Sequence, residues 1–104
     1  MKNIFQKIID KEEPAKFLYE DDDYIIIDNK FPKTPIHYLI IPKKPIISIS
    51  EIKEEDRDIL GGFLILAKKF ADQEKIIDYK LVFNTGKHQD IPHLHLHFLA
   101  GDMD

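Results

Sequence analysis

"HLHLHFLAG", residues 93–101, holds three of the five histidines of this chain, one at every second position. Successive side chains of an extended strand point to opposite faces, so His93, His95 and His97 share one face and the apolar residues between them share the other. A helix would bring only His93 and His97 together, and the helical zinc signature needs a glutamate that this stretch lacks. The pattern therefore predicts a strand that follows Pro92, with one apolar face and one face of imidazoles.

The first part of the chain predicts a short helix and a hairpin. Apolar residues within 4–9 recur at helical spacing after Asn3, a residue type that caps helices, and we expect Pro14 to end this helix. Residues 17–20 and 24–28 are rich in aromatic and β-branched side chains, which favours strands. The acidic residues between them are turn formers, so the two strands should form a hairpin.

The second half predicts two more strands around a long helix. Residues 37–42 form an apolar run that suggests a strand buried on both faces. Ser48, with Glu51 three residues later, matches a capping box, and the helix that it opens should continue to about Asp72. Residues 80–84 favour a fourth strand, and residues 85–92 a loop before the histidine strand.

Composition limits the kind of protein that this can be. The chain has 104 residues, of which 43% are hydrophobic and 33% charged, so we expect one globular domain over residues 1–104. A net charge of −4 argues against a nucleic-acid surface, which is normally basic. The absence of cysteine, of a membrane-length apolar run and of a signal peptide predicts a cytoplasmic protein without disulfides or a membrane partner.

The long predicted helix carries two apolar stripes, so its apolar arc is wide for so small a protein. The stripes are Ile59, Phe63, Leu66 and Phe70, and one position along, Leu60, Leu64, Ala67 and Ala71. One explanation is a deep core within the chain. We expect instead that part of this surface forms the interface of a homodimer, because a short chain has little else to cover it.

His93 to Leu99 resembles the histidine triad signature, His-φ-His-φ-His-φ-φ with φ apolar, of the HIT superfamily. The segments "IFQKIIDKEEPAKFLYEDD", "NKFPKTPIHYLIIPKKP", "LGGFLILAKKFA" and "VFNTG" resemble the Hint branch of that superfamily in the same order. The resemblance implies an α+β fold with a mostly antiparallel five-stranded sheet, one long helix and one short helix. It also implies a homodimer joined through the long helix and the sheet edge.

Imidazole is neutral and nucleophilic at physiological pH, so a histidine can attack phosphorus and leave again. His95 is the central histidine, and its neighbours can stabilise an anionic phosphoryl group. The resemblance implies that His95 is the nucleophile, assisted by His93, His97 and His37, and that no cofactor or metal is needed. The implied substrates are purine nucleoside phosphoramidates and aminoacyl-adenylate-like compounds, cleaved through a nucleotidyl-histidine, whereas other branches cleave dinucleoside polyphosphates.

Further positions correspond to the nucleotide site of the family. Asn29 corresponds to the residue that contacts the ribose hydroxyls, with Asp28 as a neighbouring candidate, and Asn84 to a residue near the phosphate or the leaving group. Structural roles in turns are the alternative for these polar residues. The apolar wall of the base pocket corresponds to Phe5, Ile8 and Ile27, for which core packing is equally plausible.

The loop before the triad departs from the family pattern. Gln89 is kept, but His88 replaces a glycine and Asp90 replaces a hydroxyl residue. A glycine lets backbone amides approach a phosphate, and a side chain there obstructs that approach. A nucleotide-binding or scaffold module with little catalysis is therefore one alternative to an efficient enzyme. A second alternative rests on the three histidines that share a face, because such a face can also bind a metal ion.

Overall fold

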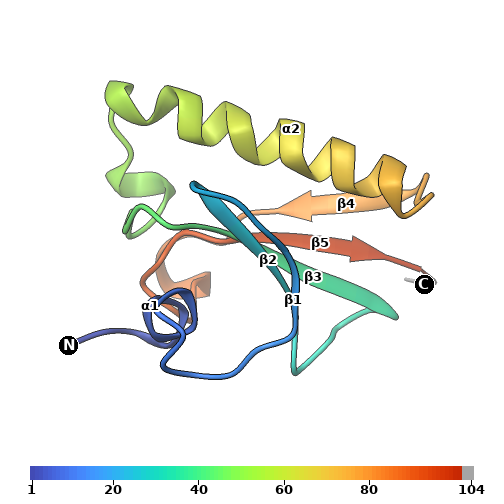
Figure 1. Cartoon of the computed structure of the whole chain (residues 1–104). Coiled ribbons are helices and arrows are strands. Elements are labelled where there is room, and N and C mark those ends of the chain that lie inside the picture. Colours follow the sequence, from blue (N-terminus) through green and yellow to red (C-terminus); the bar gives the residue numbers. More distant parts are fainter. Residues whose placement is uncertain (102–104) are drawn as a thin grey trace.

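The computed structural model of the protein describes residues 1–101, and its centre is a five-stranded antiparallel sheet (Figure 1). The strands are β1 (Phe17–Glu20), β2 (Tyr24–Asp28), β3 (Ile36–Pro42), β4 (Tyr79–Val82) and β5 (Leu96–Ala100), in the order β1-β2-β3-β5-β4. Every neighbouring pair is antiparallel. The predicted hairpin and the predicted five-stranded sheet are confirmed. The histidine strand β5 lies between β3 and β4, so both of its edges are paired.

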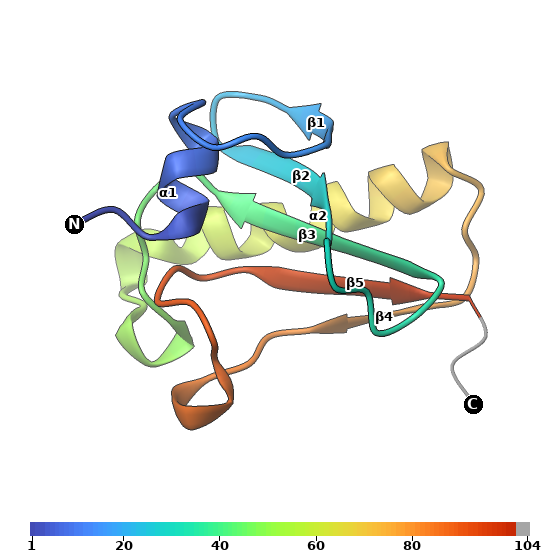
Figure 2. The same cartoon turned by 90° about the horizontal axis from the view of Figure 1, so that it is seen from below.

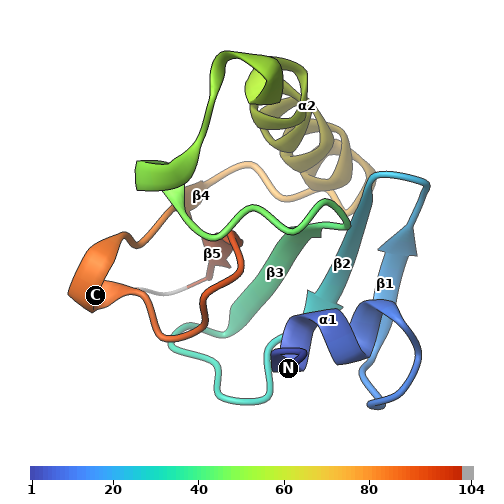
Figure 3. The same cartoon turned by 90° about the vertical axis from the view of Figure 1, so that its left-hand side faces the viewer.

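Two helices cover opposite faces of this sheet, which makes three layers (Figures 2 and 3). The long helix α2 (Arg57–Gln73) lies across one face, and the short helix α1 (Ile4–Ile9) lies against the other. Single turns of 3-10 helix occur at Ile49–Glu51, Glu54–Asp56 and Gly86–His88. The predicted pair of one long and one short helix is confirmed. None of the helices in residues 1–101 combines the length and apolarity that a membrane crossing requires.

The alternation of strand side chains divides the core between these two helices. Against α2, Phe63 and Phe70 pack on a larger cluster that includes Leu94, Leu96 and Phe98 from the histidine stretch. On the other face a smaller cluster joins α1 to the middle strands, and its buried members are Phe5, Ile8, Ile25, Ile27, Leu39 and Ile41. The apolar residues of the histidine stretch therefore face α2, as the period-two pattern predicts.

The predicted end of the first helix and the predicted start of the histidine strand are both wrong. The first helix ends at Ile9 and not at Pro14, because the chain turns back at Lys11, whose φ of 62° is left-handed. Asn3 caps it as expected, since its side chain accepts a hydrogen bond from the Gln6 N–H. Strand β5 begins at Leu96, so His93 and His95 precede it. The backbone before β5 bonds elsewhere, with the Leu94 N–H donating to the Ile46 carbonyl at 2.7 Å.

The long helix begins later than the capping pattern predicts. Ser48 makes no cap hydrogen bond, and its hydroxyl lies 2.6 Å from that of Ser50. The helix starts instead at Arg57. The carboxylate of the preceding residue, Asp56, accepts hydrogen bonds from Lys44 Nζ at 2.5 Å and from the Lys53 N–H at 2.9 Å. Asp56 is buried, so this paired carboxylate locks the turn that precedes α2.

Most of the two apolar stripes on α2 face the sheet of the same chain. Phe63 is fully buried there, which shows that this stripe belongs to the core within the chain. Leu64 is exposed, with 54% of its surface accessible, and so is its neighbour Ile65 at 59%. The surface left for a partner is therefore narrower than the sequence suggests.

Candidate active site

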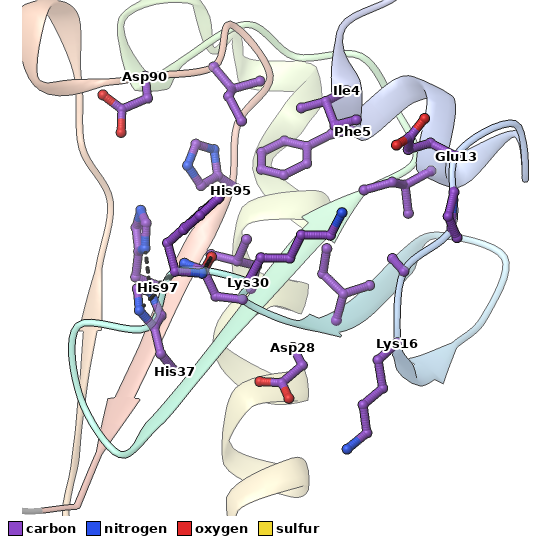
Figure 4. Close-up of a pocket in the computed structure, with 18 of the residues that line it drawn as sticks. Ile4, Phe5, Glu13, Lys16, Asp28, Lys30, His37, Asp90, His95 and His97 are labelled. Atoms are coloured by element: carbon purple, nitrogen blue, oxygen red, sulfur yellow. Dashed lines mark hydrogen bonds between the residues drawn. The ribbon is translucent and has the colours of Figure 1, made fainter.

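A cavity of about 510 Å³ opens between α1 and the sheet, on the face opposite α2, and it has the size of a small-molecule site (Figure 4). One end is apolar and is lined by Ile4, Phe5, Ile8, Ile27 and Leu39. The other end holds the rings of His37, His95 and His97. The cavity thus places an apolar surface beside a cluster of imidazoles.

His95 has a fixed tautomer. Its Nδ1 lies 2.8 Å from the backbone carbonyl oxygen of His93, and a carbonyl oxygen can only accept, so Nδ1 carries the proton. The available lone pair of the neutral ring is therefore on Nε2. This atom forms no hydrogen bond with any of residues 1–101. Phe5 packs edge-on against this ring, with 4.8 Å between the centroids.

His93 supports His95 and does not line the cavity. Its ring is buried, and its Nε2–H donates to the carbonyl of Pro42, the last residue of β3, at 2.8 Å. This bond anchors the backbone of His93, and the carbonyl of the same residue orients His95. His93 is thus a positioning residue in this geometry.

His37 and His97 form a second pair at the same end of the cavity. The Lys33 N–H donates to His37 Nδ1 at 3.0 Å, so the proton of His37 is on Nε2, which donates to His97 Nδ1 at 2.9 Å. The proton of His97 is then on Nε2, 3.3 Å from the side-chain amide of Asn84. A half-turn of that amide places its oxygen there as the acceptor, and this completes a chain of donors from Lys33 to Asn84.

All four histidines are held neutral at physiological pH. Burial lowers the pKa of His95, although the His93 carbonyl and the carboxylate of Asp90 act in the opposite direction. Burial and the neighbouring rings of His95 and His37 lower the pKa of His97 to about 4. Burial likewise lowers the pKa of His93 and of His37. A neutral imidazole is the form that can act as a nucleophile.

The remaining predicted residues fall into two groups. Asp28, Asn29 and Asp90 line the cavity together with the apolar wall formed by Phe5, Ile8 and Ile27. The amide nitrogen of Asn29 lies 3.4 and 3.3 Å from the two ring nitrogens of His37, which places it over the ring face, and its oxygen accepts from the Phe31 N–H. Their roles in binding a nucleotide stay predictions.

Gln89 and Asn84 do not line the cavity. The side-chain amide of Gln89 donates to the backbone carbonyls of Ile47 at 2.6 Å and Ile91 at 2.8 Å, which ties the loop before the triad to the segment after β3. Asn84 lies behind His97 and reaches the cavity only through that ring. In this geometry both residues support the site from outside the cavity.

Sequence reasoning missed several residues that line the cavity. Leu39 shares the strand face of His37 two positions along β3, so the period of two could have identified it. Glu13 and Lys16 follow α1, and Lys30 and Lys33 lie in the loop after β2. No pattern marks these charged residues, because only the fold brings the two segments to one cavity.

Residues 2–104 match the protein family described as "Scavenger mRNA decapping enzyme C-term binding". An uncharacterized HIT-like protein of Synechocystis sp. is 44% identical over 101 residues, which cover 94% of this chain and 89% of that relative. The chain belongs to the HIT superfamily. The family prediction made from the histidine triad is thereby confirmed.

Solved structures support the same assignment for this HIT chain. It superimposes on a HIT family hydrolase from Legionella pneumophila with a TM-score of 0.93 and 38% identity, covering 97% of this chain and 94% of the other. A histidine triad nucleotide-binding protein from Candida albicans gives a TM-score of 0.81 and 30% identity, with 91% and 71% covered. The chain therefore has the fold of HIT-family hydrolases.

The alternative of a metal site gains no support from the geometry. Among residues 1–101, no three side chains of the types His, Asp and Glu are arranged so that they could hold a metal ion. Two of the ring nitrogens that could be ligands are engaged in hydrogen bonds, His93 Nε2 with Pro42 and His97 Nδ1 with His37.

Proposed function

We propose that residues 1–104 form a single HIT domain of the Hint type that cleaves purine nucleoside 5'-monophosphate derivatives at the α-phosphate. Phosphoramidates and aminoacyl-adenylate-like compounds are the substrate class. One observation carries the proposal. The hydrogen bond from His95 Nδ1 to the His93 carbonyl leaves the Nε2 lone pair free in a cavity with an apolar wall. The Candida relative is described as nucleotide-binding and the Legionella relative as a hydrolase.

The chemistry follows from that tautomer. His95 Nε2 forms a bond to the α-phosphorus while the bond from phosphorus to the amine breaks, and the amine leaves with a proton taken from solvent. The ring now has substituents on both nitrogens and is positively charged. Its Nδ1–H still points at the His93 carbonyl, whose oxygen stabilises this charge. Water then attacks the phosphorus and gives a proton to solvent while the bond from phosphorus to Nε2 breaks, which releases the nucleoside monophosphate and restores neutral His95.

The other side chains divide the nucleotide between them in this proposal. Phe5, Ile8 and Ile27 bind the base, because they form the apolar wall. Asn29 and Asp28 line the same cavity and bind the ribose hydroxyls, for which an amide and a carboxylate are suitable partners. His97 and His37 stay neutral beside the phosphate and hold its position through their hydrogen-bonded pair.

The protein acts as a homodimer in the cytoplasm under this proposal. β4 is an edge strand of the sheet, and Ile77, two residues before it, is exposed. Leu64 and Ile65 on α2 are exposed as well. An unpaired edge and exposed apolar residues are features that a second copy can cover. The absence of cysteine suits a reducing compartment.

Trapping of the covalent intermediate tests the proposed reaction. The protein is mixed briefly with adenosine 5'-phosphoramidate and analysed by mass spectrometry without acid. We expect an added nucleotidyl mass on the peptide that contains His95, and neither adduct nor turnover with His95→Ala. Turnover by His95→Ala at the rate of the unchanged protein would refute the mechanism.

A nucleotide-binding module with little turnover is the second candidate, and Asp90 favours it. Its exposed carboxylate lines the cavity beside His95 and His97, where it opposes the approach of an anionic phosphoryl group. The same experiment separates the candidates. A binding module would bind nucleoside monophosphates but form no adduct and release no amine.

A further inference from the structure

At the apolar end of the cavity, where the proposed function places the base, one charged hydrogen-bond acceptor and one charged hydrogen-bond donor lie beside the apolar wall. Glu13 lies after α1 and Lys30 lies after β2, and both line the cavity next to the apolar wall. Neither side chain forms a hydrogen bond or an ion pair with another of residues 1–101. A carboxylate only accepts hydrogen bonds and an ammonium group only donates them. The pair therefore offers complementary contacts that the protein itself leaves unused.

The two side chains approach the same part of the cavity from different segments. Figure 4 shows the Lys30 side chain extended across the cavity, with its ammonium group directed toward the side where Phe5 and Glu13 lie. The Glu13 carboxylate points inward from the end of α1, whereas Lys16 reaches away from this group. An aromatic ring held on the apolar wall would present its edge to Glu13 and Lys30.

We infer that this cavity selects guanine over adenine, an inference that rests on the proposed nucleotide function. Guanine carries adjacent donors at N1 and at its 2-amino group, which suit Glu13, and acceptors at O6 and N7, which suit Lys30. Adenine keeps the acceptor at N7 but reverses the pattern at positions 1 and 6. Its N1 is an acceptor that faces the carboxylate, and its 6-amino group is a donor that faces the ammonium group. A site that hydrogen-bonds one base and leaves charged groups unpaired with the other discriminates strongly.

Calorimetric binding of the nucleoside monophosphates tests this inference. We expect GMP to bind about tenfold more tightly than AMP, which is the discrimination of one good charged contact at a partly exposed site. IMP keeps N1–H and O6 but lacks the 2-amino group, so its affinity should lie between the two. Equal affinities for GMP and AMP, or tighter binding of AMP, would overturn the inference.

Substitutions assign the selectivity to the two residues. Glu13→Gln supplies a donor as well as an acceptor, so the ratio of GMP to AMP affinity should move toward equality. Lys30→Met should weaken GMP more than AMP. Glu12→Gln is the matched control, since Glu12 pairs with Lys2 outside the cavity, and it should keep the original ratio.

The outcomes separate this inference from the function on which it rests. An unchanged GMP preference in Glu13→Gln and Lys30→Met would overturn the assignment to these residues. Binding of neither nucleotide by the unchanged protein would refute the proposed nucleotide function and the base selection with it. Binding of both nucleotides with equal affinity would refute base selection alone.

Discussion

His37 and His97 lie 2.9 Å apart, between His37 Nε2 and His97 Nδ1, although they are separated by 60 positions in the sequence. The register of β3 and β5 produces this contact. His97 pairs with Leu39, two residues from His37, so the two rings share one face as diagonal neighbours. Burial disfavours a positive charge on either ring, and the ring of His37 adds to the cost of charging His97, so both rings remain neutral.

We predict from this pair that acid destabilises the fold through His97. The pKa of His97 is about 4 in the folded chain and 6.5 when unfolded, so the unfolded state binds more protons between these values. The contribution of His97 to the free energy of unfolding is therefore fully present above pH 6.5. It decreases as the pH falls toward 4. The loss attributable to this residue is up to about 3 kcal/mol.

The test compares the free energy of unfolding in urea at pH 7 and pH 4.5 for the unchanged protein and for His97→Asn. Asparagine does not titrate, so the difference between the two pH values should be smaller in the variant. An identical pH dependence in both proteins would contradict the prediction.

The pH dependence of turnover should report His95. Burial lowers the pKa of His95 below its usual 6.5, so the nucleophile stays neutral at pH 6.5 and above. We expect kcat/KM for adenosine 5'-phosphoramidate to be level from that pH to pH 8 and to fall only at more acidic values. Phe5→Ala opens the ring of His95 to water, which should move the acid limb to higher pH. An acid limb centred above pH 6.5 in the unchanged protein would argue against this account.

Asp90→Ser should increase activity severalfold. Asp90 is exposed at the cavity and forms no ion pair with the described residues, so neither Lys87 nor His88 neutralises it. A partly screened carboxylate opposes the substrate phosphoryl group by about 1 kcal/mol, which corresponds to about fivefold in kcat/KM. The gain should shrink in high salt, and Asp22→Ser, in the β1–β2 turn, is the control. A clear decrease in kcat in Asp90→Ser would show that the carboxylate assists the leaving group.

The two glycines in α2 should respond in opposite ways to alanine. A Cβ on Gly62 would lie 2.1 Å from Tyr24 Oη, and this buried tyrosine is held by a 2.5 Å bond to the Ile59 carbonyl. Gly62→Ala should therefore destabilise the fold by about 1–3 kcal/mol. A Cβ on Gly61 meets nothing within 4 Å, so Gly61→Ala should stabilise it by up to about 1 kcal/mol through helix propensity. Thermal unfolding of both variants decides whether the helix is packed as described.

A charge on the exposed side of α2 should disrupt the proposed dimer. We expect the unchanged protein to sediment as a dimer at micromolar concentration, and Leu64→Asp and Ile65→Asp to sediment as folded monomers. Lys7→Asp, exposed on α1 at the opposite layer, should remain dimeric. Phe63→Asp would not test the interface, because Phe63 is in the core. A monomeric unchanged protein would refute the dimer.

The sequence alone determined which side chains share a face. The alternation of histidine and apolar residues in 93–98 follows from the period of an extended chain, and the structure keeps it even though β5 begins only at Leu96. Asn3 likewise caps α1 through a bond to a residue three positions away. These features are local, so the pattern of neighbouring residues is enough to predict them.

Only the tertiary structure decided where α2 and β5 begin and which nitrogen of each imidazole is free. Helix α2 starts at Arg57 because Lys44, from another part of the chain, holds Asp56. The ring of His93 is anchored by Pro42, 51 positions away, and its carbonyl then fixes the tautomer of His95. A hydrogen bond between distant segments depends on strand register and burial, and no local pattern of side chains contains that information.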